Sequence, residues 1–227
     1  MPQVRLWDGH NWQRANSNHV RVWDGHNWSR PHVRLWDGQR WVEGLEERRV
    51  TTWEATWTNG YWSGEMHGNI AKTGGGYAWG SNTLAQGSYS PYHDHWDWGN
   101  EGGMAGFDDG NMRWELAGAR IEKVELYLHS KWWGYGSGGE AVIGTHNARG
   151  WQKYFQERDH GVVRQRFYWR GQDMWMQMPN WVGEGLRDNW LAGITTKADN
   201  PNLWQYGIFS GTNDGWQKPK IRITYWK

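Results

Sequence analysis

A strict alternation of apolar and polar residues near the middle of the chain constrains its fold more than any other feature. Val124, Leu126 and Leu128 fall on one side of an extended chain, and the residues between them are polar or aromatic. A glycine-rich segment at 134–139 follows, and glycine permits the positive φ angles of a tight return. Residues 121–147 are therefore predicted to form the central hairpin of a β-sandwich.

The same period of two recurs elsewhere and predicts further strands. These stretches are residues 50–58, 163–170, 174–178 and 220–226. Only residues 181–190 have apolar side chains at helical spacing, with Asn180 as the predicted N-cap. Residues 60–110 show little periodicity and are predicted to form short strands joined by long loops. The predicted fold of residues 50–227 is an all-β sandwich with one short helix.

The N-terminal segment, residues 1–42, contains an internal repeat in three copies. The copies are VRLWDGHNW at 4–12, VRVWDGHNW at 20–28 and VRLWDGQRW at 33–41. Asp-Gly between extended runs indicates a two-residue hairpin turn, so an array of three short β-hairpins is predicted. With Asp8 and Gly9 as the loop, Arg5 lies opposite Trp12 in a cation–π pair, whereas a three-residue loop with a bulge changes this pairing.

A single hairpin of this size is marginally stable, so the copies are expected to pack on each other, on the main domain or on other subunits. We therefore predict that residues 1–42 form a stalk for assembly, with sugar binding by its tryptophans as the alternative. The assembly candidates are Trp7, Trp12, Trp23, Trp28, Trp36 and Trp41. A short charged stretch, residues 43–49, is the predicted linker to the main domain.

The composition excludes several kinds of partner. Lys and Arg number 25 against 24 Asp and Glu, and a net charge of +1 gives no field that attracts nucleic acid. No window approaches the ~18 apolar residues of a membrane helix, and the N-terminus has no apolar signal segment, so neither membrane insertion nor signal-dependent export is predicted. The sequence has no Cys, which excludes disulfides and thiolate metal sites. Its 23 tryptophans place much of the apolar surface in flat rings that carry one N–H donor.

Several motifs together resemble one family of viral proteins. They are the tandem VRLWDGxxW units, IEKVELYL at 121–128, WW at 132–133, AVIGTH at 141–146, GI at 193–194, YGIF at 206–209 and KIRITY at 220–225. These motifs are similar to those of minor tail proteins of phages that infect actinobacteria, and the likeness covers most of the chain except residues 60–110.

The resemblance implies a jelly-roll, carbohydrate-binding-like module displayed at the tail tip of the virion. Such modules are commonly homotrimers, and their partners are other tail or baseplate proteins and a glycan of the host envelope. The resemblance also implies assembly in the host cytoplasm and release by lysis, for which neither a signal segment nor Cys is needed.

Binding a sugar requires an exposed aromatic face that stacks on a pyranose, beside polar groups that bond its hydroxyls. One stretch that meets this requirement contains Trp132, Trp133 and Tyr135, at the tip of the predicted hairpin. A second contains Trp96 and Trp98 amid His, Asp and Asn residues. These five are the predicted glycan-binding candidates, and the alternative is that their rings cap the sandwich ends or fill a subunit interface.

One segment has the composition of a metal site. If it is extended, His93, His95 and Asp97 point to the same side and can hold a structural divalent cation. The alternative is a solvated loop whose charges pair locally. Residues 108–111, DDGN, resemble a fragment of a calcium loop but lack its distal Glu, so a turn is predicted there. No other cofactor is predicted.

The sequence carries no motif that indicates catalysis. A glycosidase needs two carboxylates across the scissile bond, and their spacing in a sequence does not show that any two face each other. The nucleophile elbow of serine hydrolases and the paired His of zinc proteases are missing from the sequence. The predicted function is thus that of a phage tail-fibre or tail-tip protein that adheres to host glycan and is not an enzyme. The alternatives are a purely structural tail or baseplate component, or a cell-wall glycan hydrolase.

Overall fold

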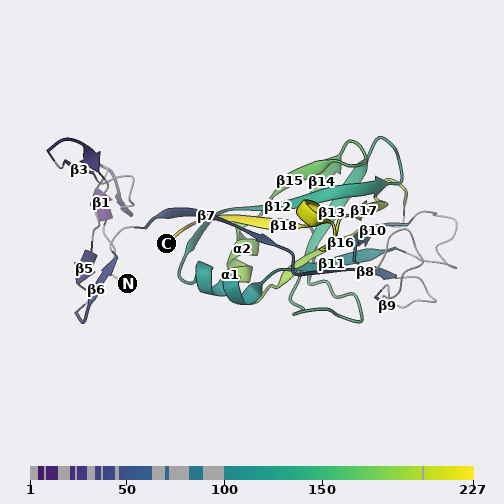
Figure 1. Ribbon diagram of the computed structural model, residues 1–227, viewed down its shortest axis with the longest axis horizontal. Coiled ribbons are helices and arrows are strands. Elements are labelled where there is room, and N and C mark those ends of the chain that lie inside the picture. Colours follow the sequence, from purple (N-terminus) through teal and green to yellow (C-terminus); the bar gives the residue numbers. More distant parts are fainter. Residues whose placement is uncertain are drawn as a thin grey trace.

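The computed structural model shows a protein built mostly from antiparallel β-strands (Figure 1). The residues that it describes are 5–7, 9–14, 21–23, 25–29, 34–36, 38–43, 46–62, 70–71, 82–88, 100–200 and 202–227. Within these ranges, no helix is long and apolar enough to span a membrane. The prediction of an all-β protein is confirmed.

Two six-stranded sheets form the main body, which we call the two-sheet domain. The first sheet contains, in order, β10 (Leu84–Gln86), β17 (Gly207–Phe209), β12 (Arg120–Trp133), β18 (Lys220–Trp226) and β7 (Arg48–Glu54), while β15 (Asp173–Met178) pairs with β12. The second sheet contains, in order, β14 (Asp159–Phe167), β13 (Gly139–His146), β16 (Gly193–Lys197), β11 (Gly102–Gly106), β8 (Trp57–Trp62) and β9 (Ile70–Ala71).

The two sheets share one apolar core. Val124, Leu126 and Leu128 of β12 are fully buried in it, as their alternation predicts. Ile143 of β13 and Ile194 of β16 belong to the same core from the second sheet. Because successive side chains of a strand point to opposite faces, Glu125, Tyr127 and His129 lie on the outer face of the first sheet.

The described residues form two α-helices, one more than predicted: the helix expected at 181–190 is confirmed, and the other was not predicted. They are α1 (Asp109–Leu116) and α2 (Asn180–Arg187), and a short 3-10 helix, η1 (Gly215–Gln217), follows later in the chain. Asp108 accepts a hydrogen bond from the backbone N–H of Asn111 at 3.1 Å, so the DDGN segment begins a helix. Asn180 was predicted to be the N-cap of this helix, but it is the first residue of α2, and its side chain donates to the Glu122 carbonyl.

The predicted central hairpin is also wrong, because β12 and β13 lie in different sheets. β15 pairs with residues 124–129 of β12, β18 pairs with residues 120–127, and β17 pairs beyond them. The neighbours of β12 therefore occupy both of its edges, and β13 pairs with β14 and β16 instead. The turn at 134–138 carries the chain from one sheet to the other.

The N-terminal repeats contain three two-stranded antiparallel sheets, which lie beyond the end of β7 in Figure 1. They pair β1 (Arg5–Trp7) with β2 (Trp12–Arg14), β3 (Val22–Trp23) with β4 (Trp28–Ser29), and β5 (Arg34–Trp36) with β6 (Trp41–Glu43). Trp7 lies opposite Trp12 and Arg5 opposite Arg14, so the predicted Arg5–Trp12 pair is wrong. The physical reason is the longer connection, residues 8–11, which replaces the predicted two-residue loop.

Candidate functional site

Trp133, one of the predicted glycan-binding residues, belongs to the core. Its side chain is fully buried, and its ring contacts Phe167 and Phe209 with centroids 5.4 Å apart in both pairs. Gly139 and Gly207 border the ring, and a Cβ atom at either position would collide with it. A ring enclosed in this way offers no face to a sugar, so Trp133 is corrected from a binding candidate to a core residue.

Trp132, the adjacent residue, points to the other side of β12 and is half-buried. The guanidinium carbon of Arg170 lies 3.3 Å from the centroid of its ring, a cation–π contact. Arg170 is itself held by hydrogen bonds to the Trp133 carbonyl, from Nε at 3.1 Å and from one terminal nitrogen at 2.9 Å. Because Trp132 is half-buried and Arg170 covers one face of its indole, Trp132 is less accessible to a ligand than an exposed ring.

Tyr135, the third candidate of this stretch, is exposed at 47% and lies where three segments of the chain meet. The Gly134 N–H donates to the Tyr206 carbonyl at 2.9 Å, which joins the turn to the loop before β17. On the other side, Gly138 lies against the backbone of Phe167 and Tyr168 at the end of β14. These contacts bring together residues from separate parts of the sequence. We call them the tip surface, which consists of the rings of Tyr135, Tyr168 and Trp204 and the side chain of Arg166.

Arg166 connects the aromatic rings of the tip surface. Its guanidinium carbon lies 3.8 Å from the ring centroid of Trp204 and 5.6 Å from that of Tyr168. It also donates a 3.0 Å hydrogen bond to the Ser137 carbonyl, inside the turn that carries Tyr135. Trp204 remains 40% exposed beside this contact. The tip surface thus combines flat aromatic faces with a fixed cation.

Acceptors border the same surface. The side-chain amide of Gln205 donates to Glu140 Oε2 at 2.9 Å and to Asp199 Oδ2 at 3.1 Å. The Arg164 guanidinium, which bonds Asp199 Oδ1 at 2.7 Å, holds the pKa of Asp199 well below its usual range. The carboxylate is therefore ionised at neutral pH. Aromatic faces beside fixed donors and acceptors are the groups that recognise a saccharide.

His160 links the same loop to the start of β14. Its Nδ1 lies 2.9 Å from Glu157 Oε2, and its Nε2 lies 3.0 Å from Asp199 Oδ1. The two ring nitrogens point in different directions, so these three side chains do not converge on one point. Among the described residues, no group of three His, Asp or Glu side chains is arranged to hold a metal ion.

Part of the predicted site lies outside the described residues. This part comprises the glycan candidates Trp96 and Trp98 and the metal candidates His93, His95 and Asp97. The hairpin tryptophans are described, and each pair has ring centroids 5.6 or 5.7 Å apart. All six are more than half exposed.

Three carboxylates at or beside α1 have structural partners. Asp108 caps α1, and Asp109 forms an ion pair with Arg149. Glu115 accepts a hydrogen bond from the Tyr225 hydroxyl. These three side chains therefore contribute to the packing of α1.

One buried histidine is also structural. His146 of β13 is completely buried, and its Nε2 lies 3.0 Å from the Ala105 carbonyl of the neighbouring region of the second sheet. Burial lowers its pKa to about 4, so the ring is neutral at pH 7.

Sequence reasoning missed several residues of the tip surface, and it also missed the outer face of β12. Tyr168 and Trp204 lie at or near strand ends, where a period of two predicts no orientation. A useful signal was present for Tyr168, since the run Tyr-Trp-Arg-Gly at 168–171 places aromatic residues at a turn, where both cannot be buried. In comparisons with known proteins, no family model matches the chain, and no curated protein matches its sequence.

Proposed function

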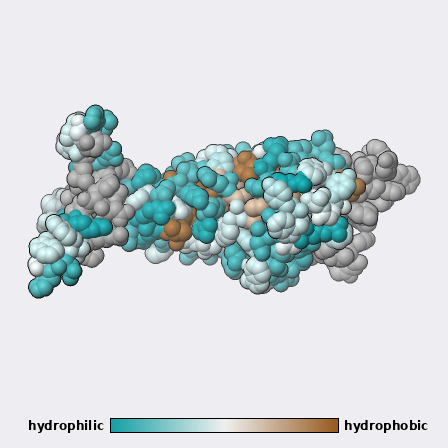
Figure 2. Space-filling model, turned by 90° about the horizontal axis from the view of Figure 1, so that it is seen from above, coloured by the Kyte–Doolittle hydropathy of each residue, from teal (hydrophilic) through white to brown (hydrophobic). Residues whose placement is uncertain are grey.

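We propose that this chain is a tail-fibre or tail-tip protein of a phage virion, whose two-sheet domain adheres to a glycan on the host cell surface. The observation that carries the adhesive role is the tip surface, where three separate segments place exposed rings beside Arg166. Figure 2 supports a polar ligand, because hydrophilic and near-neutral residues cover most of the face that it shows. Single aromatic contacts give modest affinity, and several copies on one virion multiply it.

The N-terminal repeats have the assembly role in this proposal. Each two-stranded unit leaves a pair of indoles exposed, and exposed aromatic surface of this kind is typical of protein interfaces. Three such units along one chain would bind their counterparts on two other chains in a homotrimer, or bind other tail or baseplate proteins. A jelly-roll arrangement of the two sheets and a place in the virion tail, reached by assembly in the host cytoplasm and release by lysis, complete the proposal.

The test compares retention of the full chain by isolated cell walls of an actinobacterial host. Native protein is expected to be retained, while the double variant Tyr135→Ala, Trp204→Ala binds about tenfold more weakly, a change of ~1.4 kcal/mol. Trp114→Ala is the matched control, because Trp114 is exposed but lies on α1. If the native chain is not retained, adhesion is refuted and a purely structural tail component is favoured. Release of reducing ends from the walls would instead indicate a glycan hydrolase.

A further inference from the structure

The outer face of β12 carries a second group of polar and aromatic side chains, none of which belongs to the tip surface. Tyr127 and His129 alternate with the core residues Leu126 and Leu128, and with Lys131 they face away from the core. Asp173 of β15 lies opposite His129 in the register. Its Oδ1 accepts from the Tyr127 hydroxyl at 2.5 Å and lies 2.9 Å from His129 Nδ1.

This hydrogen-bonded group is rigid. Tyr127 is almost fully buried, and burial, together with its bond to Asp173, raises the pKa of its hydroxyl well above the ordinary value. Tyr127 therefore remains a donor at all physiological pH values. Asp173 uses one carboxylate oxygen for both bonds, and its side chain is 46% exposed. Within the described part of the chain, no side chain donates to its other oxygen, Oδ2.

An exposed indole borders this group. Trp216 of η1 is 65% exposed, and its ring meets the ring of His129 at a steep angle, with centroids 6.5 Å apart. Lys131 Nζ donates to Asp214 Oδ1 at 2.8 Å, and the Gln217 amide nitrogen lies 3.2 Å from His129 Nδ1. The Lys131–Asp214 bond fastens the start of η1 to β12, and Gln217 at its end lies against His129, so the position of the indole is fixed.

We propose that Trp216, His129, Lys131, Asp173 and Gln217 form a second saccharide subsite, which binds one pyranose unit of a neutral polysaccharide. The indole face of Trp216 stacks on the C–H face of the sugar ring. Asp173 Oδ2 accepts from hydroxyl groups, and Lys131 and Gln217 donate to hydroxyl oxygens. Aromatic stacking with a few fixed polar groups is the usual arrangement of a sugar site.

The charges of the subsite favour a neutral sugar over an acidic one. Lys131 is paired with the Asp214 carboxylate, and the Asp173 carboxylate lies beside His129. No unpaired positive charge is left among these residues to attract a carboxylate or sulfate group. The ligand is therefore recognised by its hydroxyls and its ring.

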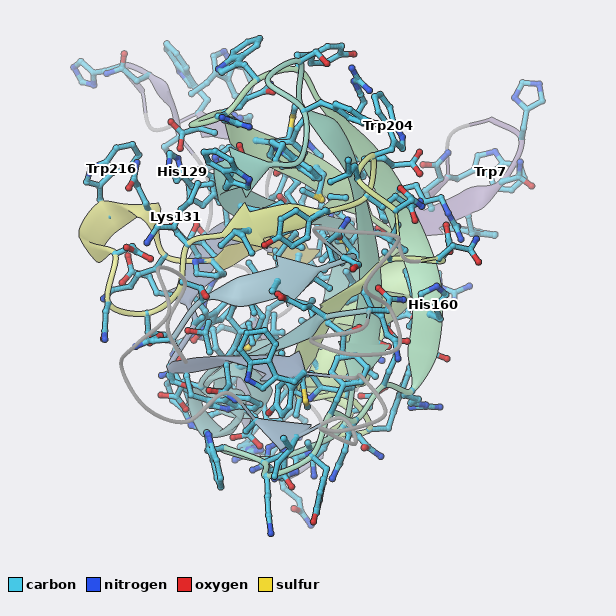
Figure 3. All side chains as sticks on the ribbon, turned by 90° about the vertical axis from the view of Figure 1, so that its right-hand side faces the viewer. Trp7, His129, Lys131, His160, Trp204 and Trp216 are labelled. Atoms are coloured by element: carbon cyan, nitrogen blue, oxygen red, sulfur yellow. The ribbon has the colours of Figure 1, made fainter. Side chains whose placement is uncertain are left out.

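The subsite rests on the proposed adhesive function but is separate from the tip surface. Figure 3 shows Trp216, His129 and Lys131 together on one side of the molecule and Trp204 on another. Two separated subsites on one domain can bind two units of the same chain or two neighbouring chains, which raises the avidity of each copy.

The test is affinity electrophoresis of the full chain in native gels that contain mannan, xylan or hydroxyethylcellulose, each a neutral polymer of pyranoses. The native chain is expected to be retarded by at least one of them, and Trp216→Ala to bind that polymer about tenfold more weakly. Asp173→Asn, which keeps the shape of the side chain, is expected to weaken binding as well. Trp114→Ala serves as the control, since Trp114 is 73% exposed but has only Lys227 as a ring neighbour among the described residues. Circular dichroism melting checks that each variant is folded.

The outcomes separate this inference from the proposed function. If Trp216→Ala is retarded like the native chain while Tyr135→Ala, Trp204→Ala is not, the second subsite is refuted and the adhesive function is supported. If no neutral polymer retards the native chain, or only dextran sulfate does, the second subsite is refuted as well, and retention by cell walls still decides the proposed function. Loss of retardation in Trp216→Ala with a normal melting curve supports the subsite.

Discussion

Trp132 and Trp133 are neighbours in sequence with opposite positions in the structure, and replacing each by Ala tests the account of β12. A tryptophan as completely buried as Trp133 removes about 150–250 Å² from water, worth about 4–6 kcal/mol at ~25 cal/mol per Å². Its indole N–H has no hydrogen-bond partner among the described residues, and relieving that cost returns about 1–3 kcal/mol. Trp133→Ala is therefore expected to lower the free energy of unfolding by about 3 kcal/mol, the lower end of the usual range for large aromatic core residues.

Trp132→Ala is the matched control. It removes a half-buried ring and its contact with Arg170, with an expected cost of about 1–2 kcal/mol. Urea unfolding of the full chain, followed by far-ultraviolet circular dichroism, measures both values and is insensitive to the loss of one fluorophore. Equal costs, or a larger cost for Trp132, would refute the assignment of Trp133 to the core.

Three further predictions concern the core, the turn and the repeats. The pKa of His146 is about 4 in the folded chain and about 6.5 in the unfolded chain, so the unfolded chain binds more protons between these values. The free energy of unfolding is therefore expected to fall by about 2 kcal/mol from pH 7 to pH 5. Urea unfolding at both pH values measures this change, and His146→Gln is expected to remove it. Gly139→Ala places a Cβ against Trp133 and the Trp204 backbone and is expected to lower the melting temperature by several degrees. Gly136→Ala, in the turn before β13, has open space and should change the melting temperature little. Equal effects would contradict the packing described. In light scattering, the native protein is expected to have the mass of about three chains. Replacing all six hairpin tryptophans by Ala is expected to reduce this mass to that of one chain, 26.7 kDa. A native chain that is already monomeric would contradict the assembly role.

The sequence predicts the class of the fold and the faces of its strands well, but not their partners. Val124, Leu126 and Leu128 are buried as predicted, because a period of two reflects only the environment of each face. Pairing depends on which edges remain free, and β18, β15 and β17 leave none on β12 for β13. The same limit explains the error at Trp133, since a residue at the end of a strand points inward or outward according to neighbours that are distant in sequence.

For the helices and the candidate surfaces, too, the sequence predicts some residues and misses others. α1 has only Met112 and Leu116 buried, too few apolar positions for helical spacing to be visible in the sequence. The capping role of Asp108 was the available signal. At the tip surface, Tyr135 was predicted from its turn, but Trp204 and Arg166 come from other segments and meet it only in the folded chain. For the outer face of β12 the sequence predicts only polar or aromatic residues, because a period of two does not show that Tyr127 and His129 both bond Asp173.

The measurement that tests the central claim most directly is binding of the fluorescently labelled full chain to host cell walls before and after oxidation with periodate. Periodate cleaves vicinal diols of sugars and leaves most polypeptide receptors intact. The account predicts saturable binding to untreated walls, reduced by Trp204→Ala, and loss of binding after oxidation. Equal binding to oxidised walls, or no binding to untreated walls, would contradict the claim that this protein adheres to a glycan.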